Sequence, residues 1–88
     1  MTTRTRFSVT TPAGVVLEGA RQGVGNGTPL VLLHGYSDSH RSFEPLLAVL
    51  PPDIDAIAFT QRGHGDSSKP RGAYRAADFA GDADAVLR

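Results

Sequence analysis

Two short polar segments of the sequence hold side chains that could do chemistry. Residues 34–40 read HGYSDSH, and residues 60–67 read TQRGHGDS. Together they contain all three histidines of the chain, along with hydroxyl, carboxylate and guanidinium groups. Imidazole and carboxylate groups can move protons or bind a metal, and a hydroxyl can act as a nucleophile beside a base. The glycines let backbone N–H groups face a developing negative charge. The two segments therefore indicate a ligand or reaction site built from two loops.

Each polar segment follows a short apolar run that predicts a strand. Residues 30–33 (LVLL) are apolar at every position, which is typical of a parallel strand covered on both faces. Residues 56–59 (AIAF) form a second such run. Between them, one face of a predicted helix over residues 43–50 carries Phe43, Leu46, Leu47 and Leu50. Strand, helix and strand predict one right-handed βαβ unit. Because the carboxyl ends of parallel strands meet at one edge of a sheet, the polar segments should lie near each other.

The helix between these strands is predicted to begin at Ser42. An N-cap there places Glu44 and Pro45 in the first turn, where a carboxylate is favoured and the missing proline N–H costs nothing. An N-cap at Ser39 would push Pro45 deeper, where it removes a helical hydrogen bond. The two prolines at 51–52 are expected to end the helix.

The N-terminal part of the sequence predicts a β-hairpin over residues 7–20. Residues 7–10 alternate apolar and polar types, residues 11–14 (TPAG) supply a turn, and residues 15–18 (VVLE) are rich in strand formers. Residues 23–27 (GVGNG) predict a flexible loop before the first apolar strand.

A last helix is predicted from about Arg75 to the end of the sequence. Its apolar stripe has two aspartates beside it, and consists of Ala76, Phe79, Ala83 and Val86. The sequence stops inside this helix before any further strand. We therefore expect residues 1–88 to be a truncated part of a single larger domain.

Composition narrows the class of protein. A chain of 88 residues and 9.3 kDa allows one small domain at most. Nine Lys and Arg balance nine Asp and Glu, which argues against a nucleic-acid partner. The lack of cysteine removes disulfides, thiolate metal sites and a cysteine nucleophile. No apolar run approaches the length of a membrane span, and no secretory signal is evident. We expect a soluble, cytoplasmic protein without a membrane partner.

The two polar segments resemble motifs of the α/β-hydrolase family. His34-Gly35, directly after an apolar strand, is similar to the family's H-G motif. Residues 62–67 (RGHGDS) are similar to its R-G-x-G-x-S loop after the next strand, and residues 42–47 (SFEPLL) resemble its first helix. The resemblance covers residues 7–88 and implies the N-terminal part of an α/β-hydrolase sheet. The implied activity is that of an esterase-like or related hydrolase acting on a small organic substrate without a cofactor.

The resemblance also implies roles for single residues. The family takes one anion-stabilising N–H from the loop behind its third strand, and that position is Tyr36 here. Gly35 is expected to let the backbone turn so that this amide faces the pocket. The Tyr36 side chain would border the substrate site, or alternatively pack under a lid. The other motif residues are expected to shape and anchor the loops: His34, Arg62, Gly63, His64 and Gly65. Arg62 would do so by donating to carbonyls or a carboxylate.

Two departures from the family's pattern matter. Many members begin the second loop with Asp, whereas this chain has Thr60, whose hydroxyl can still bond to backbone amides. The family's nucleophile sits on a G-x-S-x-G elbow, and residues 1–88 contain neither this pattern nor an Asp-bearing equivalent. None of the three histidines maps to the family's catalytic base. We expect the chain alone to be inactive, its partners being a small-molecule substrate and the remainder of its own hydrolase domain.

Three other functions would use the same residues. The histidines with Asp38 and Asp66 could suggest a metal site, but no two of them have the spacing of ligands on one element, so no metal is expected. A nucleotide loop at residues 63–68 lacks the third glycine and the following helix. A non-catalytic small-molecule binding protein on the same scaffold stays open, because fold does not fix function.

Overall fold

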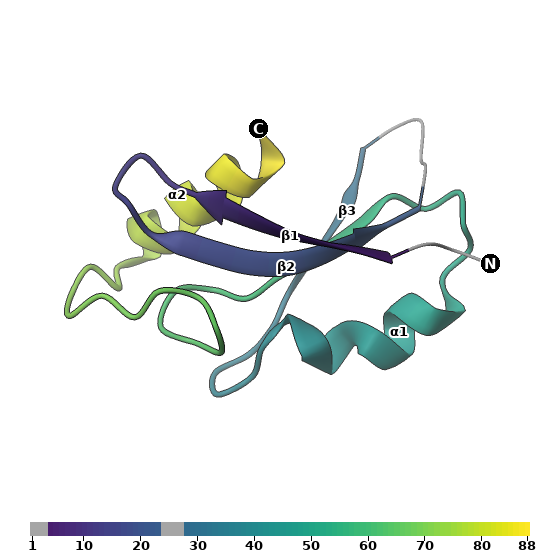
Figure 1. The fold of residues 1–88 in the computed structure, drawn as a ribbon, viewed down its shortest axis with the longest axis horizontal. Helices are drawn as coiled ribbons and strands as arrows, with labels where there is room; N and C mark the ends of the chain where they lie inside the picture. Colours follow the sequence, from purple (N-terminus) through teal and green to yellow (C-terminus); the bar gives the residue numbers. More distant parts are fainter. Residues whose placement is uncertain (1–3, 24–27) are drawn as a thin grey trace.

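The computed structural model describes residues 4–23 and 28–88 and has a four-stranded sheet at its centre (Figure 1). Its strands, in the order β1-β2-β4-β3, are β1 (Arg4–Thr10), β2 (Val16–Gln22), β4 (Ala56–Phe59) and β3 (Leu30–Leu33). β2 is antiparallel to β1 and to β4, whereas β3 and β4 are parallel. The predicted α/β class, hairpin and parallel strand pair are confirmed. Most of the loop predicted at 23–27 lies outside the described residues.

The helices lie on opposite sides of this sheet, with α1 on one side and α2 on the other (Figure 1). The segments are a 3-10 turn η1 (His40–Phe43), α1 (Glu44–Val49) and α2 (Ala76–Leu87). Ala56 and Ala58 of β4 pack with Leu47 of α1. Phe59 packs with Leu17 of β2 on the other face, where Ala83 and Val86 of α2 lie against them. Alternation along β4 therefore divides the core into two clusters, and burial of a side chain such as Phe59 contributes roughly 1.5–3 kcal/mol.

β3 lies at the edge of the sheet and is less covered than its composition predicts. All four residues of β4 are buried, but Leu30 and Leu33 of β3 are 41% and 52% exposed. Among the described residues, β4 is the only strand that pairs with β3. The outer backbone edge of β3 is therefore open, and an open edge is a surface to which another strand can pair.

The start of the helix after the first polar loop was predicted wrongly. Ser39 is the N-cap of the 3-10 turn η1, where its side-chain Oγ accepts a hydrogen bond from the Arg41 N–H over 3.2 Å, and Phe43 is the N-cap of α1. The segment begins as the 3-10 turn η1 and becomes α-helical only at Glu44. Because the hydrogen-bond pattern changes there, Pro45 still falls in the first turn of α1, where its missing N–H breaks no helical bond.

The N-terminus of α2 is closed by an interaction between Arg75 and Asp78. Asp78 Oδ2 accepts hydrogen bonds from Arg75 Nε over 3.0 Å and from the Arg75 backbone N–H over 2.9 Å. The guanidinium bonds, followed by the backbone bond, lower the pKa of Asp78 from 3.8 to about 2. The carboxylate also lies at the positive end of the helix dipole, where a negative charge is stabilising.

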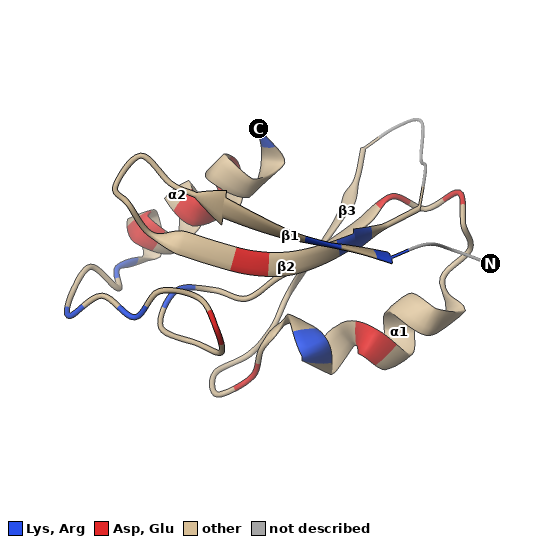
Figure 2. Cartoon of the chain, in the orientation of Figure 1, with Lys and Arg blue, Asp and Glu red and all other residues tan. Residues whose placement is uncertain are grey.

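Charged side chains are interspersed over the sheet and the helical segments (Figure 2). This distribution agrees with the zero formal charge and gives the chain no single basic face. Within residues 4–23 and 28–88, no helix combines the length and the apolar character needed to cross a membrane.

Candidate active site

The two polar loops meet at the carboxyl ends of β3 and β4. The Gln61 backbone N–H donates to His34 Nε2 over 2.9 Å, and Gln61 Nε2 donates to the His34 carbonyl over 2.9 Å. The rings of His34 and His64 lie edge to face with centroids 4.9 Å apart. Tyr36 lies edge to face on His64 with centroids 6.0 Å apart. The loops predicted to lie near each other are therefore in direct contact.

His34 is held by hydrogen bonds at both ring nitrogens. Nε2 accepts from the Gln61 amide, so the ring proton is on Nδ1, which donates to the Gly35 carbonyl over 2.7 Å. The residue is buried. A ring with both nitrogens occupied by the backbone orients the loop and leaves no free atom for proton transfer or metal binding.

Tyr36 occupies a tight turn, but Gly35 is not its left-handed residue. The Asp38 N–H donates to the Gly35 carbonyl over 3.1 Å, and Ser37 carries a φ of 69°. A positive φ at the third turn position is characteristic of a type II turn. The sharp backbone bend assigned to Gly35 thus falls at Ser37. A Cβ at Gly35 would meet nothing within 4 Å.

The Tyr36 backbone N–H and side chain are little engaged by the rest of the described chain. Within the part of the chain that the structure describes, the Tyr36 N–H donates to no protein acceptor. The residue is 93% exposed. The amide is therefore available to a ligand at the strand ends, and the ring stands beside it.

The second loop is attached to β2 by two serine hydroxyls. Ser67 Oγ accepts from the Glu18 N–H over 3.1 Å and donates to the Thr60 carbonyl over 2.7 Å. Ser68 Oγ accepts from the Val16 N–H over 2.8 Å, and the Ser68 N–H donates to the Val16 carbonyl over 2.8 Å. These bonds continue the pairing of β2 beyond the end of β4, which stops at Phe59.

Arg62 anchors the same loop to α2. Its Nε and one terminal nitrogen donate to the two Asp82 oxygens, each over 2.7 Å, and the other terminal nitrogen donates to the Ala73 carbonyl over 2.7 Å. Both side chains of the ion pair are buried. The hydrogen bonds to Asp82 raise the pKa of Arg62 above its ordinary value, against the opposing effect of burial. Each of the three guanidinium nitrogens therefore donates a hydrogen bond, two to Asp82 of α2 and one to the Ala73 carbonyl.

The motif glycines occupy positions that other residues fit poorly. Gly63 and Gly65 have φ values of 82° and 46°, in the left-handed region. A Cβ on Gly63 would lie 2.7 Å from Tyr74 Cε1, and one on Gly65 would lie 3.1 Å from Thr60 Cγ2. His64 between them donates from Nδ1 to the Arg62 carbonyl over 3.0 Å, given the acceptor-only character of that oxygen.

Glu18, His40 and Thr60 form a largely buried polar cluster that the sequence does not predict. Thr60 Oγ1 accepts from the His40 N–H over 2.9 Å and lies 2.8 Å from His40 Nδ1. Glu18 Oε1 lies 3.2 Å from the same Nδ1. His40 and Thr60 are buried. The hydroxyl of Thr60 was expected to bond local amides, whereas its partner is twenty positions away in the chain.

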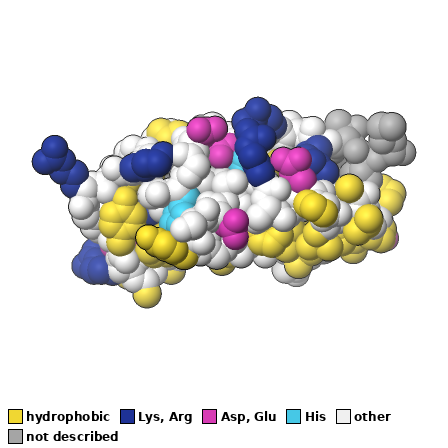
Figure 3. All heavy atoms as spheres, turned by 90° about the horizontal axis from the view of Figure 1, so that it is seen from below, with side chains coloured by type: hydrophobic (Ala, Val, Ile, Leu, Met, Phe, Trp, Pro, Cys, Tyr) yellow, Lys and Arg dark blue, Asp and Glu magenta, His cyan; other side chains and the backbone are white. Residues whose placement is uncertain are grey.

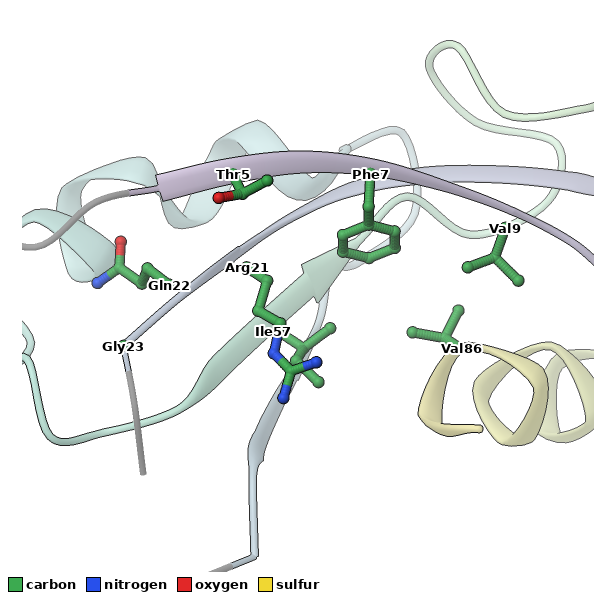
Figure 4. A pocket seen from close by; sticks show the side chains of 8 residues that line it. All are labelled: Thr5, Phe7, Val9, Arg21, Gln22, Gly23, Ile57 and Val86. Atoms are coloured by element: carbon green, nitrogen blue, oxygen red, sulfur yellow. The ribbon is translucent and has the colours of Figure 1, made fainter. Parts of the chain in front are cut away.

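A hollow of about 480 Å3 opens beside Tyr36 and is lined by Tyr36, Ser37, Gly63, His64, Tyr74 and Phe79. The space-filling view shows histidine among hydrophobic side chains on one part of the surface, and a wider hydrophobic area elsewhere (Figure 3). A larger hollow of about 570 Å3 lies between β1, β2, β4 and the end of α2 (Figure 4). Its lining includes Phe7, Val9 and Val86 but no residue of either polar loop. We therefore place the candidate site at the smaller hollow.

No metal centre emerges from the described ranges, 4–23 and 28–88. They contain no group of three or more His, Cys, Asp or Glu side chains placed to hold an ion. His34 and His40, which could supply ligands, are engaged with backbone and hydroxyl groups of the protein.

Comparison with known proteins places this geometry in context. The alpha/beta hydrolase fold family matches residues 28–88. The 2-(acetamidomethylene)succinate hydrolase of Mesorhizobium japonicum is 39% identical over 64 residues, which are 73% of this chain and 23% of that protein. A probable oxidoreductase of Mycobacterium tuberculosis, EphD, is 37% identical over 81 residues, which are 90% of this chain and 14% of that protein. The chain thus spans less than a quarter of either relative.

Solved structures give the same picture. The crystal structure of E-2-(acetamidomethylene)succinate hydrolase superposes with a TM-score of 0.82 at 31% identity, covering 98% of this chain and 31% of that chain. A structure described among epoxide hydrolases from metagenomes of hot environments has a TM-score of 0.84 at 30% identity, covering 97% of this chain and 29% of that one.

Proposed function

The chain belongs to the α/β-hydrolase fold family, and on that basis we propose that it is the N-terminal part of a hydrolase acting on a small organic substrate. Within this enzyme it supplies one donor of the oxyanion hole, the Tyr36 backbone N–H, and lacks the nucleophile. One observation carries the proposal: the Tyr36 amide has no protein acceptor among the described residues and stands where β3 and β4 end.

The proposed chemistry is stabilisation of negative charge. When a nucleophile attacks a carbonyl group, its oxygen becomes an oxyanion, and fixed N–H donors lower the energy of that state. The Tyr36 amide would donate one hydrogen bond. The family takes its second donor from the residue after the nucleophile. Removing one such donor from a hydrolase typically costs about 100- to 1,000-fold in kcat.

The Tyr36 ring is proposed to border the bound substrate. It rests edge to face on His64 and lines the hollow that also contains Tyr74 and Phe79. Aromatic side chains offer apolar contact area with few rotatable bonds. An apolar portion of the substrate would therefore lie beside the ring, with the reacting carbonyl at the Tyr36 amide.

The nucleophile is proposed to come from protein outside these 88 residues. The sequence contains no G-x-S-x-G pattern. His34 and His40 are occupied by hydrogen bonds within the fold. His64 lines the hollow, but its Nδ1 is bonded to the Arg62 carbonyl, and within the described residues its ring forms no hydrogen bond to a hydroxyl. The chain alone is therefore expected to bind weakly at most and to hydrolyse nothing.

This proposal is tested by assaying the 88-residue chain beside the protein encoded by the complete reading frame. Nitrophenyl esters with short and long acyl chains, an epoxide and a haloalkane cover the reaction types. We expect turnover of at least one class by the longer protein and none by the chain. Turnover by the chain would refute the missing nucleophile. Binding without turnover by the longer protein would favour a binding protein on this scaffold.

Tyr36→Pro tests the oxyanion role more sharply, because proline has no backbone N–H. Tyr36 is the second residue of the turn that Gly35 and Asp38 close, a position that accommodates proline, so the substitution should leave the fold intact. Tyr36→Ala is the control, since it removes the ring and keeps the amide. In the longer protein we expect kcat to fall further in Tyr36→Pro than in Tyr36→Ala, with similar KM in the two variants, because the hole acts on the transition state. Equal kcat in the two variants would count against the Tyr36 amide as a donor.

A further inference from the structure

Hydrogen bonds attach the two ends of the loop that carries Tyr36 to Gln61 and Thr60, the two residues that directly follow β4. At its start, His34 bonds to Gln61 through the ring Nε2 and through the backbone carbonyl. At its end, the His40 N–H and ring Nδ1 both contact Thr60 Oγ1, over 2.9 and 2.8 Å. Thr60 directly follows β4, so both attachments rest on the most buried strand of the sheet.

Glu18 sets the proton position on the His40 ring. Its Oε1 lies 3.2 Å from His40 Nδ1. An ionised carboxylate only accepts hydrogen bonds, so Nδ1 must carry the proton for this contact to be favourable. The ring proton is then shared between Glu18 and Thr60. Glu18 in turn is fixed by its backbone, whose carbonyl accepts the Thr60 N–H over 2.7 Å.

Between its two attachments the described loop has few internal bonds. The Gly35 carbonyl accepts from the Asp38 N–H over 3.1 Å and from His34 Nδ1 over 2.7 Å, while Tyr36 and Asp38 are exposed. Loops with few buried contacts open readily by local fluctuation. The position of the Tyr36 amide must therefore be determined largely by its two ends.

We propose that His40 and Thr60, braced by Glu18, are positioning residues that hold the Tyr36 loop in place together with the His34–Gln61 attachment. This inference deepens the proposed function, since its catalytic consequence rests on the oxyanion role of Tyr36. Thr60 is the shared acceptor of the arrangement, because its hydroxyl oxygen accepts from both the backbone N–H and the ring Nδ1 of His40.

A matched pair of variants at Thr60 tests the proposal. Thr60→Val removes the hydroxyl and keeps the shape, while Thr60→Ser keeps the hydroxyl. In the chain, Thr60→Val removes the acceptor of the buried His40 N–H and so loosens one end of the loop. We therefore expect amide hydrogen exchange of Asp38, within that loop, to speed up by at least about fivefold. Thr60→Ser should restore slow exchange, and amides of the β1–β2 ladder should change in neither variant. Unchanged Asp38 exchange in Thr60→Val, or no rescue by Thr60→Ser, would overturn the proposal.

Turnover separates this inference from the proposed function. In the longer protein, Thr60→Val should lower kcat with KM retained, and Thr60→Ser should recover kcat. If exchange at Asp38 speeds up but kcat is unchanged, the attachment stands and the oxyanion role of Tyr36 fails.

A second measurement requires no variant. The imidazole ¹⁵N shifts of His40 in the wild-type chain should show a proton on Nδ1 at neutral pH. A neutral ring with its proton on Nε2 would contradict the arrangement, because Glu18 would then face an unprotonated nitrogen.

Discussion

Arg62 and Asp82 form a two-pronged ion pair, with Nε and a terminal nitrogen each 2.7 Å from a carboxylate oxygen. The pair joins the second polar loop to α2, twenty residues further along the chain. Its side chains are only 6% and 2% exposed. Removing one partner of a buried pair leaves the other charge without compensation, which makes this contact a sensitive point of the fold.

Asp82→Asn should therefore destabilise the chain by about 3–5 kcal/mol. Asp84→Asn is the matched control, since Asp84 forms an exposed ion pair with Arg88 on the same helix and should cost under about 1 kcal/mol. Urea unfolding followed by circular dichroism compares the two, because the chain has no tryptophan. Equal losses of unfolding free energy in both variants would show that the buried pair contributes no more to stability than the exposed one.

Gly63→Ala should destabilise the chain by about 1–2 kcal/mol from backbone strain alone. Its φ is 82°, and the new methyl group would press on Tyr74, whose hydroxyl is bonded to the Pro70 carbonyl over 2.6 Å. Gly35→Ala provides the control and should change stability by less than about 0.5 kcal/mol. Thermal unfolding of both variants checks the contrast, which a harmless Gly63→Ala would contradict.

Acid should weaken the start of α2 only at low pH. The pKa of Asp78 is lowered from 3.8 to about 2 by the Arg75 guanidinium and backbone N–H. Its contribution is therefore complete above pH 3.8 and disappears as pH falls toward 2. The pKa of Asp55 is lowered as well, chiefly by its hydrogen bonds from Arg21, so its contribution is lost in the same direction.

A carboxyl ¹³C titration measures the effect directly. We expect the midpoint of Asp78 near 2, and Arg75→Ala should return it toward 3.8. Arg88→Ala, which removes an ion pair at the other end of α2, should leave it unchanged. A wild-type midpoint near 3.8 would refute the helix-start interaction.

The open edge of β3 should make the isolated chain associate. Leu30 and Leu33 are exposed, and residues 30–33 contain neither a charge nor a proline to discourage strand pairing. Sedimentation velocity should show species larger than a monomer, and Leu33→Lys should shift them toward monomer. Val49→Lys, at a 77% exposed position on α1, is the control and should have little effect. A sharp, monomeric unfolding transition of the wild-type chain would contradict this expectation.

Local sequence patterns predicted the elements well where neighbouring residues determine them. The strands at residues 30–33 and 56–59 have the predicted bounds, because each apolar run ends at a proline or a polar residue on either side. The start of the helix was misplaced, because a 3-10 turn from His40 let Ser39 act as N-cap without placing Pro45 in the helix interior.

The contacts of the site depend on residues far apart in the chain. The group of Glu18, His40 and Thr60 draws on β2, η1 and the end of β4, and no spacing rule connects such positions. Asp82 is one of the two aspartates beside the apolar stripe of α2, and its burial against Arg62 depends on where the second polar loop lies, which local sequence does not determine. The role of the Tyr36 amide as an anion donor stays a prediction until turnover is measured.

The hydroxyls of Ser67 and Ser68 act as substitute rungs of the sheet for the amides of Glu18 and Val16. Swinging this loop outward would break the hydrogen bonds to both amides, and a typical hydrogen bond contributes on the order of 0.5–1.5 kcal/mol. The second loop therefore forms a fixed wall of the site and is not expected to move when substrate enters. Any movable cover that admits substrate is expected to come from a different segment.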